Sequence, residues 1–175
     1  ADSGWSVVRE GAVAAGDIVR LQRRRILFLC TGNTCRSPLA AALAKRLLAD
    51  RLGCEVSELR SRGFEVSSAG LLAGPGAAAT AEARQVARER GADLSHHRTR
   101  GADAELIRRS DVVFCMTDRH VAEATRVAPE AAEAIRRLDG ETDIADPVGR
   151  GLDRYRDVAG QIAAALRRHI DEGLL

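Results

Sequence analysis

The hydrophobic pattern becomes regular at Arg25, where short apolar runs begin to alternate with longer amphipathic segments. Ile26-Leu-Phe-Leu29 is a continuous apolar run followed by a glycine-containing turn, which is typical of a strand buried on both faces. The same criteria predict further strands at about 64–69 and 111–116, and a weaker one near 134–138. Helical spacing and composition predict helices over 38–50, 80–90, 118–127 and 152–170.

Strands that alternate with helices predict an α/β fold, a doubly wound four-stranded parallel sheet flanked by helices in the Rossmann or flavodoxin manner. Ligands of such sheets bind beyond the carboxyl ends of the strands. The loop that follows Leu29 lies at such an end. We therefore expect this loop to contain the functional site.

The length of 175 residues, 45% of them hydrophobic, fits one ordinary core with a short extension. We expect one domain over 23–175 and an N-terminal arm over 1–22. Within the arm, Trp5 to Val13 has the pattern of a short strand and turn. Its Arg-Glu-Gly-Ala phrase resembles the closing tail of threonylcarbamoyl-adenylate synthase domains, so the arm is either the end of such a domain or a disordered or edge-packed extension.

Charged residues make up 30% of the chain and leave a formal net charge of +2, which predicts no nucleic-acid partner. No apolar run approaches the roughly 20 residues that cross a bilayer, and the start of the chain lacks the pattern of a signal peptide. We therefore expect a cytoplasmic protein without a membrane partner, whose four cysteines stay reduced. No histidine or second cysteine pair lies at zinc-ligand spacing, so neither a metal nor another cofactor is expected.

The segment Cys30-Thr-Gly-Asn-Thr-Cys-Arg36-Ser37 has the composition of an anion-binding loop. Gly32 and Asn33 are residue types that tolerate a positive φ, so the backbone can turn its N–H groups toward a common centre. Ser37 followed by Pro38 predicts a helix start with Ser37 as the N-cap. The loop would then run into a helix N-terminus, which favours a phosphate, and the Arg36 guanidinium could hold two phosphate oxygens.

Cys30 would lie at the entrance of this loop, where donors that favour a phosphate also favour a thiolate. The hydroxyl of Ser37 could support the thiolate further. This arrangement predicts a nucleophile in line with a bound phosphoryl group. The alternative is that Cys30 and Cys35 are small buried apolar residues and that Gly32 forms an ordinary turn. The combination of strand, Cys, five residues, Arg, Ser and Pro favours the catalytic interpretation.

The run from Ile26 to Pro38 resembles the signature of the low-molecular-weight protein tyrosine phosphatase family. The likeness covers about 25–170 and continues through Ser67–Gly70, Leu94–His96, Asp111–Thr117 and Asp146–Pro147. It implies hydrolysis of phosphorylated proteins through a phosphocysteine intermediate, with Cys30 as nucleophile. It also implies that the phosphate is bound by Thr31, Gly32, Asn33, Thr34, Cys35 and Arg36.

The resemblance assigns three further roles. Asp146 would be the general acid for the leaving group and then the base for water; the alternative is an aspartate that caps the last helix, a role that Asp153 could also fill. Cys35 would be a redox partner that forms a reversible disulfide with Cys30, or else a packing cysteine. His96 would brace Asn33, or be an ordinary surface histidine.

Two positions bear on the substrate. Tyrosine-specific members of the family place aromatic residues after the Asp-Pro pair, where this chain has Val148-Gly-Arg150. They also carry an aliphatic residue where this chain has Thr34. These features resemble the protein arginine phosphatase branch, although members of that branch have an aromatic residue at the position of Val148. We expect phosphoarginine in proteins as the substrate, with phosphotyrosine as the alternative.

Two other functions compete with this hypothesis. A thioredoxin-coupled arsenate reductase uses a similar loop but needs a downstream cysteine pair, whereas Cys54 and Cys115 are far apart in the sequence. A non-catalytic phosphate-binding module would need only the loop. The presence of every catalytic residue type disfavours that second alternative.

Overall fold

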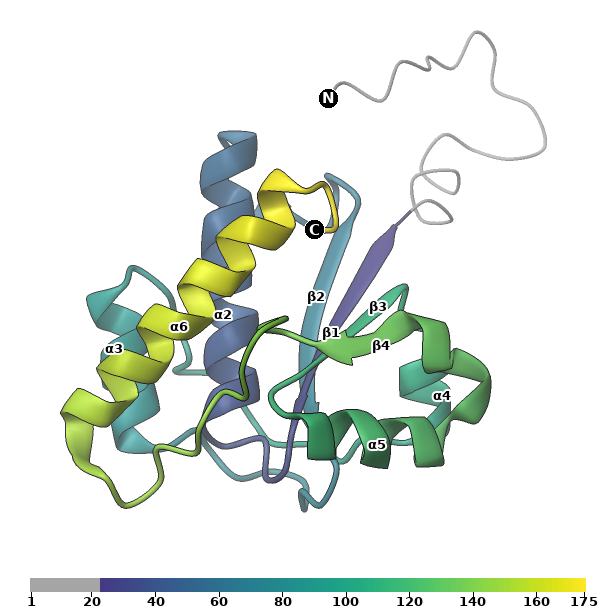
Figure 1. Cartoon of the computed structure of the whole chain (residues 1–175). Helices are drawn as coiled ribbons and strands as arrows, with labels where there is room; N and C mark the ends of the chain where they lie inside the picture. Colours follow the sequence, from purple (N-terminus) through teal and green to yellow (C-terminus); the bar gives the residue numbers. More distant parts are fainter. Residues whose placement is uncertain (1–22) are drawn as a thin grey trace, which may run out of the picture.

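The computed structural model describes residues 23–175, which form a four-stranded parallel sheet with helices on both faces (Figure 1). The strand order is β2-β1-β3-β4. The strands are β1 (Arg24–Cys30), β2 (Phe64–Gly70), β3 (Val112–Cys115) and β4 (Ile135–Arg137). The predicted fold class is confirmed. The predicted arm over 1–22, with its relation to a synthase domain, lies outside the described residues.

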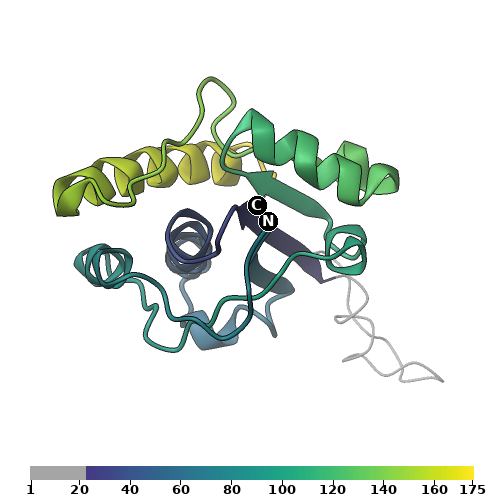
Figure 2. The same cartoon turned by 90° about the horizontal axis from the view of Figure 1, so that it is seen from below.

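The sheet separates two groups of helices, as Figure 2 shows. One face is covered by α2 (Arg36–Leu52), α3 (Ala81–Glu89) and α6 (Gly151–Asp171). The other is covered by α4 (Ala104–Arg108) and α5 (Asp118–Val127). Two 3-10 helices, η1 (Val56–Glu58) and η2 (Pro129–Ala134), lie in the connections.

The apolar run of β1 explains why the sheet is covered on both faces. Ile26 and Phe28 belong to the core beneath α2 and α6, whereas Leu27 and Leu29 belong to the core beneath α4 and α5. Alternate residues of a strand point to opposite faces, so a continuous apolar run needs a core on each side. The strand is thereby fixed in position, and so is the loop that follows it.

Local sequence signals set most of the helix ends. The side chains of Thr80, Asp103 and Thr117 each cap a helix by accepting a hydrogen bond from a backbone amide of its first turn. Gly53 ends α2 in the left-handed conformation. The prediction of Ser37 as an N-cap is wrong, because α2 begins at Arg36 and its N-cap, Cys35, makes no side-chain capping bond. The Ser37 hydroxyl instead contacts Cys30 and Asn33 in the loop between β1 and α2.

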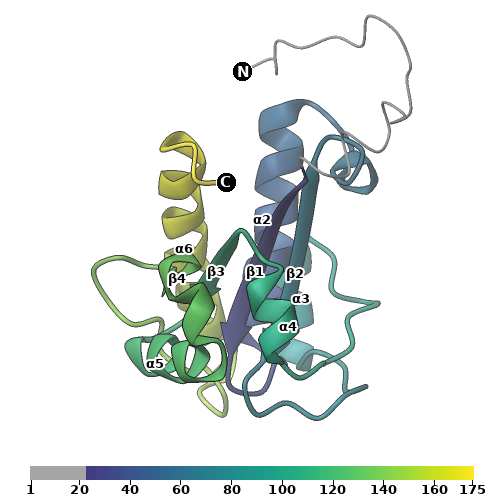
Figure 3. The same cartoon turned by 90° about the vertical axis from the view of Figure 1, so that its right-hand side faces the viewer.

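The carboxyl ends of β1 and β2 and the loops that follow them lie at the same edge of the molecule (Figures 1 and 3). After β1 the chain forms β2, which pairs with one edge of β1, and it later forms β3, which pairs with the opposite edge. This reversal next to β1 is the position where open α/β sheets bind ligands. In residues 23–175, no helix is both long enough and apolar enough to cross a membrane.

Candidate active site

The loop between β1 and α2 exposes a row of backbone donors. Among residues 23–175, the amides of Thr31 to Cys35 find no hydrogen-bond acceptor. The loop continues directly into the first turn of α2, whose amides also lack intrahelical partners. Consecutive free amides at a helix N-terminus form a binding site for an anion such as phosphate.

Asn33 holds the loop in shape from within. It is fully buried and has a positive φ of 53°, a conformation that asparagine tolerates better than most residues. Its Nδ2 donates to Ser37 Oγ (2.9 Å) and to Ser68 Oγ (3.0 Å), and its Oδ1 accepts from the Arg100 amide (3.1 Å). The predicted positive φ is therefore found at Asn33 and not at Gly32.

Gly70, at the end of β2, lets the loop approach the neighbouring strand. A Cβ atom at this position would lie 2.6 Å from the Thr31 carbonyl oxygen and 2.8 Å from the Asn33 nitrogen. Such distances to backbone atoms require the loop itself to move. The resemblance of Ser67–Gly70 to the family thus has a structural basis, because a side chain at Gly70 would displace the anion-binding loop.

Cys30 lies at the end of β1 with its sulfur 3.0 Å from Ser37 Oγ. Ser37 accepts a hydrogen bond from Asn33, and its own hydrogen can go to the Ala69 carbonyl (3.2 Å) or to Cys30. A thiol at Cys30 can donate to Ser37, and a thiolate can accept from it. The predicted support of Cys30 by Ser37 therefore has a geometric basis in this contact.

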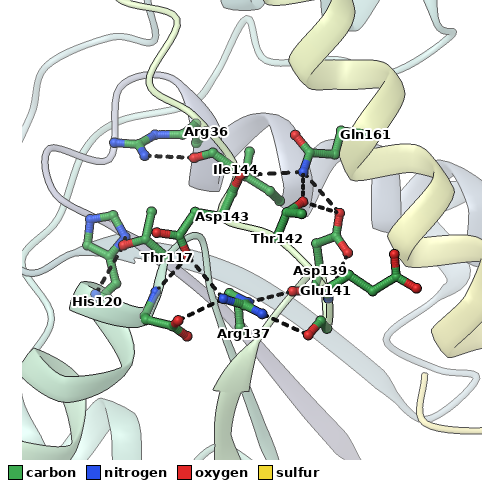
Figure 4. A network of polar contacts seen from close by, with 12 residues as sticks. Arg36, Thr117, His120, Arg137, Asp139, Glu141, Thr142, Asp143, Ile144 and Gln161 are labelled. Atoms are coloured by element: carbon green, nitrogen blue, oxygen red, sulfur yellow. Dashed lines mark hydrogen bonds and ion pairs between the residues drawn. The ribbon is translucent and has the colours of Figure 1, made fainter.

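Arg36 connects the loop with Asp146. Its guanidinium donates to Asp146 Oδ2 (2.7 Å) and to the Ile144 carbonyl (3.0 Å), and its side chain is only 7% exposed. The pair brings the segment before α6 to the start of α2 (Figure 4, Arg36 and Ile144). Asp146 Oδ1 accepts from the Val148 amide, and the N-cap of α6 is Arg150. Asp146 is therefore part of the site and does not cap the helix.

The histidine that contacts the loop is His97, so the prediction for His96 is wrong by one residue. His97 Nε2 donates to the Asn33 carbonyl at 2.8 Å, whereas the side chain of His96 is exposed. Burial lowers the pKa of His97 and outweighs the opposing effect of its bond to Asn33. A neutral imidazole can make this single donation. Two adjacent histidines in a turn face different directions, and the sequence does not show which one faces inward.

Cys35 turns its sulfur toward a buried cluster on the other side of the loop. Cys35 Sγ lies 3.3 Å from the Tyr155 hydroxyl and 3.6 Å from Thr80 Oγ1, and Thr80 donates to Tyr155 at 3.2 Å. Burial and the contact with Cys35 raise the pKa of Tyr155. Cys30 and Cys35 are both free thiols in this structure. Tyr155 thus has a polar contact with the loop in addition to its packing in the core.

His120 is a site residue that the sequence analysis missed. Its imidazole is buried between Thr31 Oγ1 (2.9 Å from Nε2) and Thr117 Oγ1 (2.8 Å from Nδ1). Burial lowers its pKa, and the positive charge of Arg36 lowers it further. No motif marks this residue in the sequence, since its contact with Thr31 arises from the pairing of β1 with β3.

The two predicted specificity residues differ in exposure. Thr34 is half-buried with its hydroxyl 3.5 Å from Cys35 Sγ, whereas Val148 is 58% exposed. Within the described part of the chain, no group of three His, Cys, Asp or Glu side chains could hold a metal ion.

Comparisons with known proteins find similar sequences and structures over most of this chain. A family model described as low molecular weight phosphotyrosine protein phosphatase matches residues 25–172. A protein-arginine-phosphatase of Geobacillus stearothermophilus is 35% identical over 151 residues, which cover 82% of this chain and 92% of the relative. The low molecular weight protein-tyrosine-phosphatase Etp of Escherichia coli K12 is 33% identical over 152 residues, which cover 85% and 93%. A solved structure of a Cys-to-Ser mutant of the YwlE arginine phosphatase, with a phosphorylated active-site serine, has a TM-score of 0.73 at 30% identity and covers 84% of this chain and 93% of its own.

Proposed function

The chain belongs to the low molecular weight phosphotyrosine protein phosphatase family, and on this premise we propose that it hydrolyses phosphoarginine in proteins through a phosphocysteine at Cys30. The observation that best supports this proposal is the convergence of three groups at one loop. The Cys30 sulfur contacts Ser37, the amides of the loop are free within 23–175, and Arg36 joins the loop to Asp146. The phosphoserine in the mutant YwlE arginine phosphatase supports a covalent step at the corresponding cysteine.

In the first step, the Cys30 thiolate attacks phosphorus while the loop amides and Arg36 hold the phosphoryl oxygens. In the structure the Arg36 guanidinium contacts Asp146. When the substrate binds, its phosphoryl oxygens replace Asp146 as the hydrogen-bond acceptors of this guanidinium. The S–P bond forms as the P–N bond to the substrate guanidino group breaks. Asp146 donates its proton to the departing nitrogen. The products of this step are unmodified arginine and phosphocysteine.

In the second step, Asp146 accepts a proton from water as the water oxygen attacks phosphorus. The S–P bond breaks, inorganic phosphate leaves, and the electron pair returns to Cys30 as a thiolate. The Ser37 hydroxyl stabilises this thiolate by donating across the 3.0 Å contact. Both steps use groups of this chain and water alone, so the proposal includes no metal or other cofactor.

The aromatic residues of 23–175 support phosphoarginine over phosphotyrosine. Phe28 and Phe114 are buried in the core, and Tyr155 is buried with its hydroxyl on Cys35. Phe64 lies at the first residue of β2, the opposite end of the strand from Gly70. None of them is placed to stack on a phenol ring, an interaction that aromatic substrates exploit. Thr34 instead offers a hydroxyl that can contact a polar guanidinium.

Replacing Thr34 with isoleucine is expected to shift the substrate preference from phosphoarginine toward phosphotyrosine. The substitution keeps the β-branched shape but removes the hydroxyl, so phosphoarginine loses a polar partner and a phenol gains an apolar one. We expect the ratio of kcat/KM for phosphoarginine over phosphotyrosine to fall by about tenfold or more, as for other single contacts that discriminate substrates. Steady-state kinetics with two matched phosphopeptides measure this ratio.

Thr125→Ile is a matched control, because Thr125 lies on α5 outside the loop and undergoes the same chemical change. The control should leave the ratio unchanged. A wild-type preference for phosphotyrosine that Thr34→Ile does not alter would refute the assignment of the substrate.

We further propose that Cys35 protects Cys30 from irreversible oxidation. A peroxide oxidises the Cys30 thiolate to a sulfenic acid. The Cys35 thiol then attacks that sulfur and an S–S bond forms, while the S–O bond breaks and the hydroxide leaves as water with the proton of the Cys35 thiol. Both thiols lie in one short loop, and the pairing requires Cys35 to turn its sulfur away from Tyr155 toward Cys30. After hydrogen peroxide treatment, wild type should regain most of its activity with dithiothreitol, whereas Cys35→Ser should regain little. Equal recovery of both proteins would leave Cys35 as a packing residue.

Two competing functions receive less support. An arsenate reductase would need further reactive cysteines, but Cys115 is completely buried, and burial raises its pKa to about 12. A non-catalytic phosphate-binding module would not need Asp146 in contact with Arg36. We propose phosphorylated proteins as the partners and the cytoplasm as the location, because a free thiolate nucleophile requires a reducing compartment.

A further inference from the structure

Arg137, the last residue of β4, is at the centre of a polar network that includes the segment before Asp146 (Figure 4). Its Nε donates to the Asp139 carbonyl (2.7 Å) and its Nη2 to the Gly140 carbonyl (2.7 Å). Its Nη1 donates to Asp118 Oδ2 (2.7 Å) and to Asp143 Oδ1 (3.3 Å). All three guanidinium nitrogens are used, and the side chain is only 18% exposed.

The contacts of Arg137 fix a particular path of the chain. Two of its acceptors are backbone carbonyls of consecutive residues, which a planar guanidinium can hold at once. The Asp143 carboxylate also accepts from the Asp118 amide (2.9 Å), so the segment is attached to the start of α5 as well. An isolated exposed ion pair contributes little, but a half-buried network of this kind restricts the backbone at several points.

Further contacts hold the backbone between Asp143 and Asp146, the proposed general acid. The Ile144 amide donates to the Met116 carbonyl (2.8 Å), and the Ile144 carbonyl accepts from Arg36 (3.0 Å). Two residues later, Asp146 meets the same guanidinium. Gln161 of α6 holds the segment from its other side, donating to Asp139 Oδ2 (2.9 Å) and to Thr142 Oγ1 (3.0 Å).

We propose that Arg137 is a positioning residue for Asp146: it fixes the loop over 138–146 so that the acid stands beside Arg36 and the leaving group. This inference rests on the proposed function, because it requires Asp146 to be the general acid. A group that donates a proton must lie within hydrogen-bond reach of the acceptor, and a displacement of about 1 Å can cost about 100-fold in rate. Arg137 itself touches no reacting atom and acts only through the loop.

The test compares Arg137→Met with Arg136→Met in the full chain. Methionine keeps an unbranched stem but removes the guanidinium. Arg136 is the adjacent residue of the same strand and, within residues 23–175, donates only to the Glu133 carbonyl (3.2 Å), so it is a matched control for the loss of a charge. Kinetics are measured with phenyl phosphate, whose leaving group needs the acid, and with p-nitrophenyl phosphate, whose leaving group needs it less.

For Arg137→Met, we expect kcat for phenyl phosphate to fall by about 10- to 100-fold and kcat for p-nitrophenyl phosphate to fall much less. Inhibition by inorganic phosphate should stay unchanged, since the loop amides remain in place. Arg136→Met should behave as wild type. In the Asp146→Asn background, Arg137→Met should cause no further loss, because the displaced group is already absent. Arg137→Lys should restore part of the rate.

An equal loss for both substrates, or losses from Asp146→Asn and Arg137→Met that multiply, would overturn the inference. Should Arg137→Met not fold at the assay temperature, Arg137→Lys decides the question in the same way, since an ammonium cannot hold all four acceptors. If Asp146→Asn alone shows no dependence on the leaving group, the proposed role of Asp146 fails, and this outcome is distinct from a failure at Arg137.

Discussion

Replacing Cys30 with serine is expected to abolish turnover while leaving phosphate binding intact. Serine keeps the shape of the side chain and the contact with Ser37 but is a far weaker nucleophile than a thiolate. We expect kcat to fall by about 10⁴-fold or more, in the range seen when other enzymes lose a covalent nucleophile. Inorganic phosphate should still raise the Tm of the variant, because the amides of Thr31 to Cys35 are unchanged.

Cys54→Ser is the matched control for this substitution. Cys54 is a free, partly exposed cysteine next to the core, outside the loop. The Cys54→Ser substitution should leave kcat unchanged. This result would separate the loss of the nucleophile from a general effect of replacing a cysteine with serine. A Cys30→Ser protein that turns over at a substantial fraction of the wild-type rate would show that another group attacks the phosphorus.

Replacing Asp146 with asparagine is expected to slow hydrolysis by about 10²- to 10³-fold for substrates with poor leaving groups, the usual contribution of general acid catalysis. The substitution keeps the size of the side chain and can still accept a hydrogen bond from Arg36. Phosphoarginine should be affected strongly, since its guanidino nitrogen leaves only when protonated. Steady-state kinetics across a series of leaving groups measure this effect.

Asp153→Asn is the control, because Asp153 is an exposed carboxylate in the first turn of α6 that pairs with Arg156. Its removal should leave the rate unchanged for every leaving group in the series. A uniform loss for Asp146→Asn across all leaving groups would assign Asp146 to binding instead of proton transfer.

The elements of the sheet could be predicted because their sequence signals are local. The apolar run of β1 and the cap at Thr80 depend on a few neighbouring residues. The short helix α4 was missed, since its five residues are too few to show a helical period, although Asp103 caps it in the usual way. Likewise, the loop could be predicted as a candidate anion-binding site from one segment, because Cys30, Asn33 and Arg36 lie within seven consecutive residues.

The remaining features depend on contacts between distant parts of the chain. Ser37 has the sequence of an N-cap, but Cys30 and Asn33 provide partners for its hydroxyl that the cap prediction could not foresee. The choice of His97 over His96 depends on how the turn faces the loop. The network of Arg137 joins residues of β4, α5 and the loop over 138–146, and no spacing in the sequence indicates it.

The central claim, that the Cys30 sulfur becomes phosphorylated, is tested most directly by trapping the intermediate. Wild-type protein is mixed with a phosphoarginine peptide, quenched in acid within the first turnover and analysed by mass spectrometry of its peptides. The account predicts a phosphoryl group on the peptide that contains Cys30, attached to sulfur, which forms and then decays as phosphate is released. Turnover without any such phosphoenzyme, or a phosphoryl group on a different residue such as His120, would contradict it.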